Sequence, residues 1–169
     1  MMIRMLVLLG TVMIPAVPKA SARVPSDATI LGTLAASDAN EIEEAKLGSS
    51  KAKALEVKDY ADVLVRDTER LRQEAVVLAT RLAITPVVDT SGAASHRDLM
   101  TKLNALAGVA FDHAFVQAMV DAHKAALAKL SGSFLPAASN PQLKAYIRKL
   151  IPTVRDHETM GERWLSTHK

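Results

Sequence analysis

Four stretches of the chain repeat apolar residues at alternating three- and four-residue steps, which places their side chains on one face of an α-helix. Helices are predicted over about residues 26–51, 55–82 and 96–130, and from residue 140 toward the C-terminus. Ser26 is suited to cap the first of them, and Asn140 followed by Pro141 is suited to open the last. The pattern therefore predicts an all-α fold.

A segment without periodicity, residues 84–95 (ITPVVDTSGAAS), separates the second predicted helix from the third. It is longer than an ordinary turn between helices and could reach roughly 40 Å if fully extended. We therefore expect it to cross the length of the domain, so that helices 2 and 3 run parallel. This is the connection of a ferritin-like four-helix bundle with a long crossover between helices 2 and 3.

Three further breaks are expected along the predicted helices. Gly108 is expected to divide the third helix into a short arm and a longer main part, and Ser131-Gly132-Ser133 to end it. Pro152 lies inside the fourth helix and should kink it, because proline cannot donate to the carbonyl of Arg148.

Polar residues occupy several positions of the apolar seams, where a helix is expected to face the core. An unpaired buried carboxylate or imidazole costs several kcal/mol, so each needs a partner or a shared metal ion. Glu41 and Thr68 should lie level with each other, whereas His123 and His157 should be offset by roughly 8 Å along the helices. The residues concerned are Glu41, Thr68, Asp112, His123 and His157.

Each of these residues also has an explanation without a metal. The two histidines can hydrogen-bond to a carboxylate or a carbonyl, and Glu41 can lie at a solvated boundary. Thr68 can donate back to the Leu64 carbonyl, and Asp112 can pair with a histidine or cap the break at Gly108. No helix carries the Glu-x-x-His pair of di-iron bundles.

The composition agrees with helix packing, since 49% of residues are hydrophobic and only 4% are aromatic. The chain has no cysteine, so thiolates are excluded both as metal ligands and as nucleophiles. It also lacks a glycine-rich phosphate loop, a nucleophile elbow and the spacing of a catalytic triad. No catalytic residue is therefore predicted.

Residues 1–22 have the pattern of a signal peptide, which leaves residues 23–169 as a single domain. Arg4 provides the positive start, residues 5–17 are mostly apolar, and Ala20-Ser21-Ala22 is a small-residue cleavage motif. We expect an exported protein that is periplasmic or associated with the outer membrane.

Removal of this segment would leave the domain nearly neutral. The whole chain has 21 basic and 18 acidic residues, and the segment contains two of the basic ones, Arg4 and Lys19. A near-neutral domain without a basic stripe is not expected to bind nucleic acid. The partner is unknown, and association with the cell envelope and formation of a homo-oligomer both stay open.

Three segments carry a resemblance to a known family. They are AKLGSSKAKALEVKDYADVLVRD (residues 45–67), LNALAGVAFDHAFVQAMVDAH (103–123) and NPQLKAYIRKLIPTVRDH (140–157). Over about residues 27–160 the chain resembles the bacterial exported family named domain of unknown function 4142, whose members are described as outer-membrane or periplasmic proteins. The resemblance implies a ferritin-like four-helix fold and export, and it implies no settled reaction.

The same resemblance bears on the candidate ligands. The family pattern has a glutamate that matches Glu41 and an Asp-His pair in the second helix, which here is Asp67-Thr68. If the inward glutamate and histidines of the family bind metal, this chain has lost one ligand at Thr68.

Two functional hypotheses follow from the sequence. The preferred one is a non-enzymatic, envelope-located helical protein with an interaction or stress-related role and no cofactor. The alternative is a ferritin-like module that binds a divalent transition metal such as iron or zinc. Inward nitrogens within about 4–5 Å of a common point would favour the alternative. Its candidate ligands are Glu41, Asp67, Asp112, His123 and His157.

Overall fold

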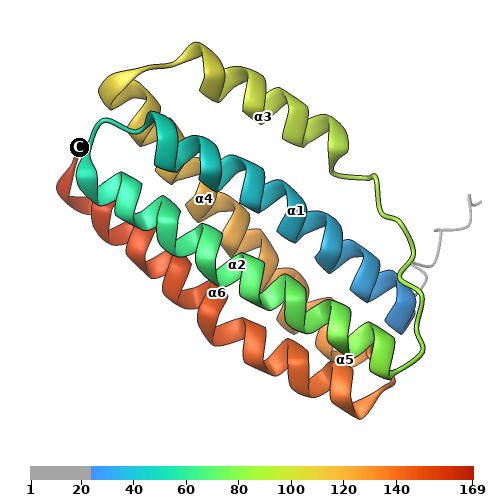
Figure 1. The fold of residues 1–169 in the computed structure, drawn as a ribbon. Helices are drawn as coiled ribbons and strands as arrows, with labels where there is room; N and C mark the ends of the chain where they lie inside the picture. Colours follow the sequence, from blue (N-terminus) through green and yellow to red (C-terminus); the bar gives the residue numbers. More distant parts are fainter. Residues whose placement is uncertain (1–23) are drawn as a thin grey trace, which may run out of the picture.

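The computed structural model describes residues 24–169, so the predicted signal peptide lies outside the described residues. This part of the chain is helical and contains no strand, which confirms the predicted all-α fold (Figure 1). None of its helices is long and apolar enough to cross a membrane. The elements are α1 (Asp27–Lys51), α2 (Leu55–Arg81), α3 (Ala93–Ala105), α4 (Gly108–Lys129), the π-helical turn η1 (Leu130–Phe134), α5 (Leu135–Ala137) and α6 (Pro141–Thr167).

The N-caps predicted at Ser26 and Asn140 are confirmed. The Ser26 hydroxyl accepts a hydrogen bond from the Thr29 N–H at 3.2 Å, and the Asn140 side chain accepts one from the Gln142 N–H at 2.8 Å. Asp27 joins the two caps in space, because its carboxylate accepts from the N–H groups of residues 139 and 140. The start of α1 is thereby fixed to the start of α6.

Four long helices lie side by side and form two antiparallel pairs (Figure 1). Helix α1 packs closely along α2, and α4 packs closely along α6. The two pairs meet mainly where α2 lies beside α6, whereas α1 and α4 touch at few places. The short helix α3 lies outside this group, along α1.

The connection between α2 and α4 differs from the expected extended crossover. Residues 82–92 pass the start of α1, where the Val87 N–H donates to the Ala28 carbonyl at 2.9 Å. Gly32 permits this contact, since a Cβ atom there would lie 1.6 Å from the Val87 carbonyl oxygen. Helix α3 then makes the return along the domain, and Gly108, at φ +60°, opens α4. The helices on either side of the connection are parallel, as expected (Figure 1).

Helix α4 ends at Lys129, close to the predicted end at residue 130, but the helical path does not stop there. Ser131-Gly132-Ser133 does not stop the helix, because the chain continues through the π turn η1 and through α5 to Ala137. The wider π turn keeps both Leu130 and Phe134 buried. Helix α6 also continues through Pro152. Because the helical path continues to Ala137, His123 and His157 lie at similar distances from the turn that precedes α6.

Two apolar clusters form the core, one toward each end of the long helices. The first includes Leu31, Leu71 and Leu143, and the second includes Leu64, Phe111 and Phe115. On every long helix, polar residues lie between the two clusters in sequence. We call these residues, Glu41, Thr68, His123 and His157, the polar layer.

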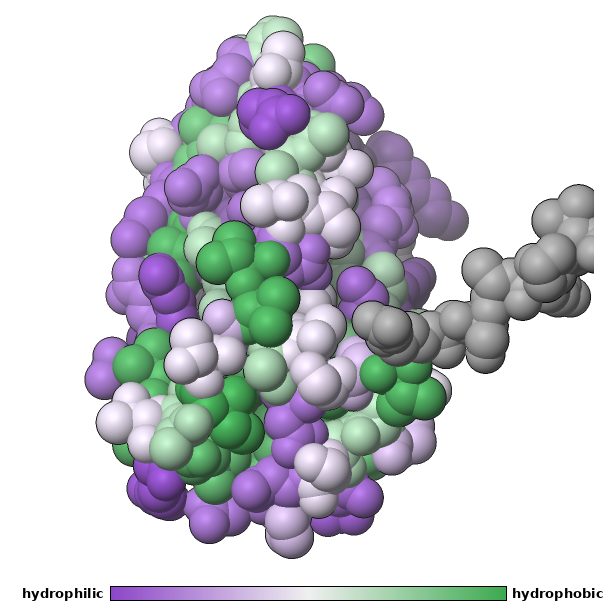
Figure 2. All heavy atoms as spheres, turned by 90° about the vertical axis from the view of Figure 1, so that its right-hand side faces the viewer, coloured by the Kyte–Doolittle hydropathy of each residue, from purple (hydrophilic) through white to green (hydrophobic). Residues whose placement is uncertain are grey.

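The end of the molecule beside the α2–α3 connection is mixed in character (Figure 2). Hydrophobic residues gather there in separate groups among hydrophilic ones. In the connection itself, Val87 and Val88 are exposed. This view therefore shows no single continuous apolar patch.

Candidate metal centre

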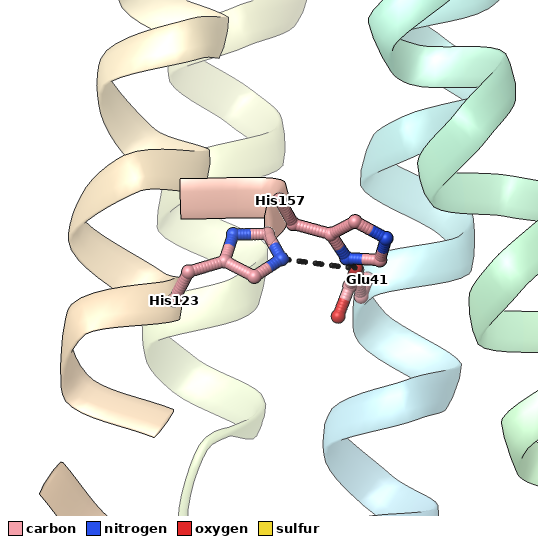
Figure 3. Close-up of side chains that lie close together, drawn as sticks. All are labelled: Glu41, His123 and His157. Atoms are coloured by element: carbon pink, nitrogen blue, oxygen red, sulfur yellow. Dashed lines mark ion pairs between the residues drawn. The ribbon is translucent and has the colours of Figure 1, made fainter. Parts of the chain in front are cut away.

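Side chains from three helices converge in the polar layer (Figure 3). Glu41 comes from α1, His123 from α4 and His157 from α6. Each offers one ligand atom, and these three atoms all lie within 4.8 Å of one another. The expected offset between the two histidines is wrong: their ring centroids lie 5.3 Å apart, and the helical path continues beyond α4 through η1 and α5 to Ala137.

The carboxylate of Glu41 lies at the centre of this group. Its Oε1 atom is 3.3 Å from Nε2 of His123 and 3.9 Å from Nδ1 of His157. Both histidines are buried, whereas a quarter of the Glu41 side chain (25%) remains accessible. Within residues 24–169, His123 Nε2 makes no hydrogen bond despite its burial.

The other nitrogen of each histidine is held by an oxygen acceptor. His123 Nδ1 lies 2.6 Å from the Met119 carbonyl oxygen, and His157 Nε2 lies 3.2 Å from Oδ2 of Asp67. A carbonyl or carboxylate oxygen can only accept, so these outer nitrogens carry the hydrogen atoms. The lone pairs of two neutral rings would then face Glu41. Metal-binding histidines are commonly oriented by such outer hydrogen bonds.

Thr68 belongs to the same network. Its hydroxyl donates to Glu41 Oε1 at 3.0 Å, so the two residues lie level as expected. This bond replaces the expected one to the Leu64 carbonyl. It lies on the side of Glu41 that faces α2, and it fixes the carboxylate in the polar layer.

The pKa shifts within the group favour one positive charge beside Glu41. Burial alone would raise the pKa of Glu41, but His123, His157 and the Thr68 hydroxyl outweigh burial and lower that pKa. Burial alone would lower the pKa of His123, but Glu41 outweighs it and raises that pKa. Burial lowers the pKa of His157, which Asp67 opposes only in part. Three acceptors thus surround a space that favours either a proton on His123 or a metal cation.

The remaining two candidate ligands lie outside this group of three. Asp67 contacts the outer nitrogen of His157, so it orients that ring. Asp112 accepts from the N–H groups of Lys53 and Ala54, at 2.9 Å each. It therefore caps the joint between α1 and α2 and not, as suggested, the break at Gly108.

A comparison with protein families places the chain. A family model described as a domain of unknown function, DUF4142, matches residues 13–163. The chain belongs to the DUF4142 family. Searches of curated proteins and of solved structures found no match. Because the family description names no activity, the function of this DUF4142 protein has to be inferred from its own side chains.

The role of Asp112 as a cap can be tested by stability. In the DUF4142 protein, Asp112→Ala leaves two partly buried N–H groups without their acceptor, so we expect a loss of roughly 1–3 kcal/mol in the free energy of unfolding. Urea unfolding measures this loss, and Asp112→Asn, which keeps one acceptor, should lose less. Unchanged stability, or a loss of metal affinity in a folded variant, would contradict the assignment.

Several polar residues near Glu41, His123 and His157 were not predicted from the sequence. Asp38 lies in the seam of α1, which was its only signal in the sequence, and its Oδ2 atom is buried without a hydrogen-bond partner in the described part of the chain. Glu44 is buried and contacts His96 Nδ1 at 2.8 Å, while His96 Nε2 contacts Glu43 at 3.0 Å. His96 comes from α3, which the hydrophobic pattern did not place against α1.

A cavity of about 340 Å³ lies beside Glu41, His123 and His157. Helices α1 and α4 form its main walls, and the start of α3 covers part of it. Glu41, His123 and His157 line it, together with Asp38 and Glu44. A metal ion bound by the first three residues would therefore face an open space.

The buried Asp38 predicts a pH dependence of stability. Burial raises the pKa of Asp38 to about 7, with a further contribution from the Glu41 charge and partial opposition from Arg72. In the unfolded chain Asp38 ionises near pH 4. The free energy of unfolding therefore decreases as the pH rises from about 4 to about 7. The cost in the folded DUF4142 protein is roughly 2–4 kcal/mol above pH 7.

The variant Asp38→Asn should remove this cost. Its stability relative to the wild type should rise by roughly 2–4 kcal/mol between pH 4 and pH 8, as measured by urea unfolding at both values. Asp62→Asn, on the exposed face of α2, controls for the loss of a negative charge. A difference between Asp38→Asn and the wild type that is the same at both pH values would contradict the prediction.

Proposed function

We propose that this DUF4142 protein binds one divalent transition metal ion through Glu41, His123 and His157. The observation that carries the proposal is the convergence of their three ligand atoms within 4.8 Å in the core. The outer hydrogen bonds of both histidines support it, because they direct the inner nitrogens to the same space. Of the two hypotheses from the sequence, the metal-binding module is therefore the one favoured here.

The kind of metal follows from the donor atoms. Two imidazoles and one carboxylate suit zinc or ferrous iron, whereas magnesium and calcium prefer oxygen ligands. Ligand atoms around a tetrahedral zinc ion at about 2.0–2.2 Å are roughly 3.4 Å apart. Glu41 and His123 already meet this spacing at 3.3 Å. His157 would have to move toward the ion by a small amount.

Fold and location are part of the same proposal. Two antiparallel helix pairs, with a long connection between parallel helices α2 and α4, support a ferritin-like four-helix arrangement. The signal-peptide pattern of residues 1–22 supports export, to the periplasm or the outer membrane. A non-enzymatic interaction or stress-related role stays a prediction, and no catalytic residue is proposed.

Metal stoichiometry tests the proposal. The purified protein, freed of metal by chelation and titrated with Zn²⁺ in a calorimeter, should bind about one equivalent. At a zinc concentration 100 times the dissociation constant, the stability should rise by about 2.7 kcal/mol. Elemental analysis after dialysis checks the stoichiometry.

His96→Gln is the matched control for this titration. His96 is another histidine that lines the cavity and contacts carboxylates, but it is not one of the three proposed ligands. The control should keep the wild-type stoichiometry and affinity. The proposal would be contradicted if the wild type bound well below one equivalent of zinc. It would also be contradicted if His96→Gln failed to bind zinc.

A further inference from the structure

The cavity beside the metal centre is mostly apolar away from the proposed ligands. Its apolar wall is formed by side chains from α1, α2, the π turn and α6. At about 340 Å³ it falls in the size range of sites for small organic ligands. The wall includes Leu34, Leu71, Leu130, Phe134, Leu150 and Val154.

The number of protein ligands leaves the metal incomplete. Zinc, cobalt and ferrous iron bind at least four donors, and Glu41, His123 and His157 supply three. All three residues line the cavity. The remaining position of a bound ion therefore faces the cavity, and a molecule that occupies the cavity could donate the missing ligand.

The charges around the cavity favour a neutral donor over an anionic one. Besides Glu41, two further acidic residues line the cavity: Glu44 is buried, and Asp38 is partly buried with its Oδ2 atom inaccessible. His96 is already engaged by Glu43 and Glu44, and Lys129 at the exposed side is the lysine that lines the cavity. An anionic head group near the metal would have to approach these carboxylates.

The cavity has an entrance beneath α3. Ala122 and Ala125 of α4 line the cavity and are exposed, so the wall opens to solvent on this side. Helix α3 is held over it at its start by His96 and at its end by Lys51, which donates to the carbonyls of Leu103 and Asn104. A small molecule could therefore reach the cavity without separating the long helices.

We infer that the cavity is a binding site for a small, mostly apolar molecule with a neutral nitrogen donor, which completes the coordination of the metal. This inference rests on the proposed metal centre. The apolar body packs against the wall named above, and the donor atom reaches the ion from the cavity side. Both the apolar body and the donor atom contribute to affinity, and their contributions can be tested separately.

Cobalt-loaded protein allows the inference to be tested by visible absorption, because the d–d bands of Co²⁺ change with its ligands. The probes are imidazole, which has only the donor, and 4-phenylimidazole, which adds an apolar ring. We expect both to change the spectrum, and 4-phenylimidazole to bind about tenfold or more tightly because its ring is buried.

A pair of α4 variants separates the cavity from the metal. Ala126 lines the cavity, so Ala126→Phe should fill it. The affinity for 4-phenylimidazole should then fall toward the affinity for imidazole. Ala128 is exposed on the same helix and does not line the cavity, so Ala128→Phe should keep the wild-type preference. Circular dichroism and the cobalt spectrum before probe addition confirm that each variant is folded and loaded.

The outcomes distinguish the two proposals. If cobalt gives no stoichiometric spectrum, the metal centre is wrong and the cavity inference falls with it. If cobalt binds but neither probe changes its spectrum, the metal centre holds and the inference is overturned. Equal affinities for the two probes, or an unchanged preference in Ala126→Phe, would also overturn it.

Discussion

His123→Ala is expected to weaken Zn²⁺ binding by at least about 100-fold, and His157→Ala by a similar factor. Each variant removes one of three protein ligands, and changing even an outer partner of a ligand typically costs 10–100-fold in affinity. Asp67→Asn, which alters only the outer hydrogen bond of His157, should therefore fall within that smaller range. Competition with a chromophoric chelator measures all of these affinities.

A third histidine provides the control for this series. His113 lies on α4 like His123, but its ring packs against Trp164 at 4.9 Å between centroids and is not one of the three converging groups. His113→Ala should bind zinc as tightly as the wild type. Because removal of His123 leaves Glu41 with less compensation in the core, His123→Gln serves as a second variant that retains a polar side chain. Wild-type affinity in folded His123→Gln and His157→Ala would contradict the ligand assignment.

Phe115→Ala should reduce the free energy of unfolding by about 3–5 kcal/mol, the largest effect on stability that we expect from a single substitution. Phe115 is completely buried, and its ring stacks on Phe111 at 5.9 Å between centroids and meets Tyr60 edge-on. It lies so close to α1 that a Cβ atom at Gly48 would be 2.5 Å from its ring. The surrounding helices are held by other contacts and cannot collapse fully into the space left behind.

Urea unfolding followed by circular dichroism measures this loss. Val109→Ala is the control, since Val109 belongs to the same helix but is 57% exposed, and it should change stability by less than about 0.5 kcal/mol. The proposed ligands lie in the polar layer and not in this apolar cluster, so folded Phe115→Ala should bind zinc as the wild type is expected to do. A loss below about 1 kcal/mol would show that the second cluster is not the tightly packed core described here.

Several features of the site could be predicted from the seams. A step of three or four residues fixes which face a side chain occupies, so Glu41, Thr68, His123 and His157 were all assigned to the core. The pairing of Glu41 with Thr68 followed from their equal distance to the α1–α2 joint, and the two side chains are hydrogen-bonded. Positions within one helical hairpin depend mainly on a rise per residue that is nearly constant.

Other features could not be predicted, because they depend on geometry that the hydrophobic pattern does not contain. The π turn η1 and α5 continue the helical path beyond the end of α4 to Ala137, and in this arrangement His123 lies beside His157. The backbone N–H groups capped by Asp112 belong to a joint far away in sequence, so its partner could not be found locally. Helix α3 buries only Leu103 completely and is held by polar contacts, which gives it a weak apolar seam.

The polar layer also affects the stability of this DUF4142 protein. It separates two apolar clusters with groups whose burial is unfavourable unless they are paired, and it includes His123 Nε2, which has no hydrogen-bond partner in residues 24–169. A metal ion would satisfy this nitrogen, the inner nitrogen of His157 and the Glu41 carboxylate together. Without a metal ion, the contacts that compensate the burial of Glu41 are the Thr68 hydroxyl and His123.

Anomalous X-ray diffraction at the zinc edge, from crystals of the zinc-loaded protein, tests the central claim most directly. We predict one strong peak about 2.0–2.2 Å from His123 Nε2, His157 Nδ1 and a carboxylate oxygen of Glu41. The absence of a peak between these residues in loaded protein, or a peak held instead by His96 with Glu43 and Glu44, would contradict the metal centre proposed here.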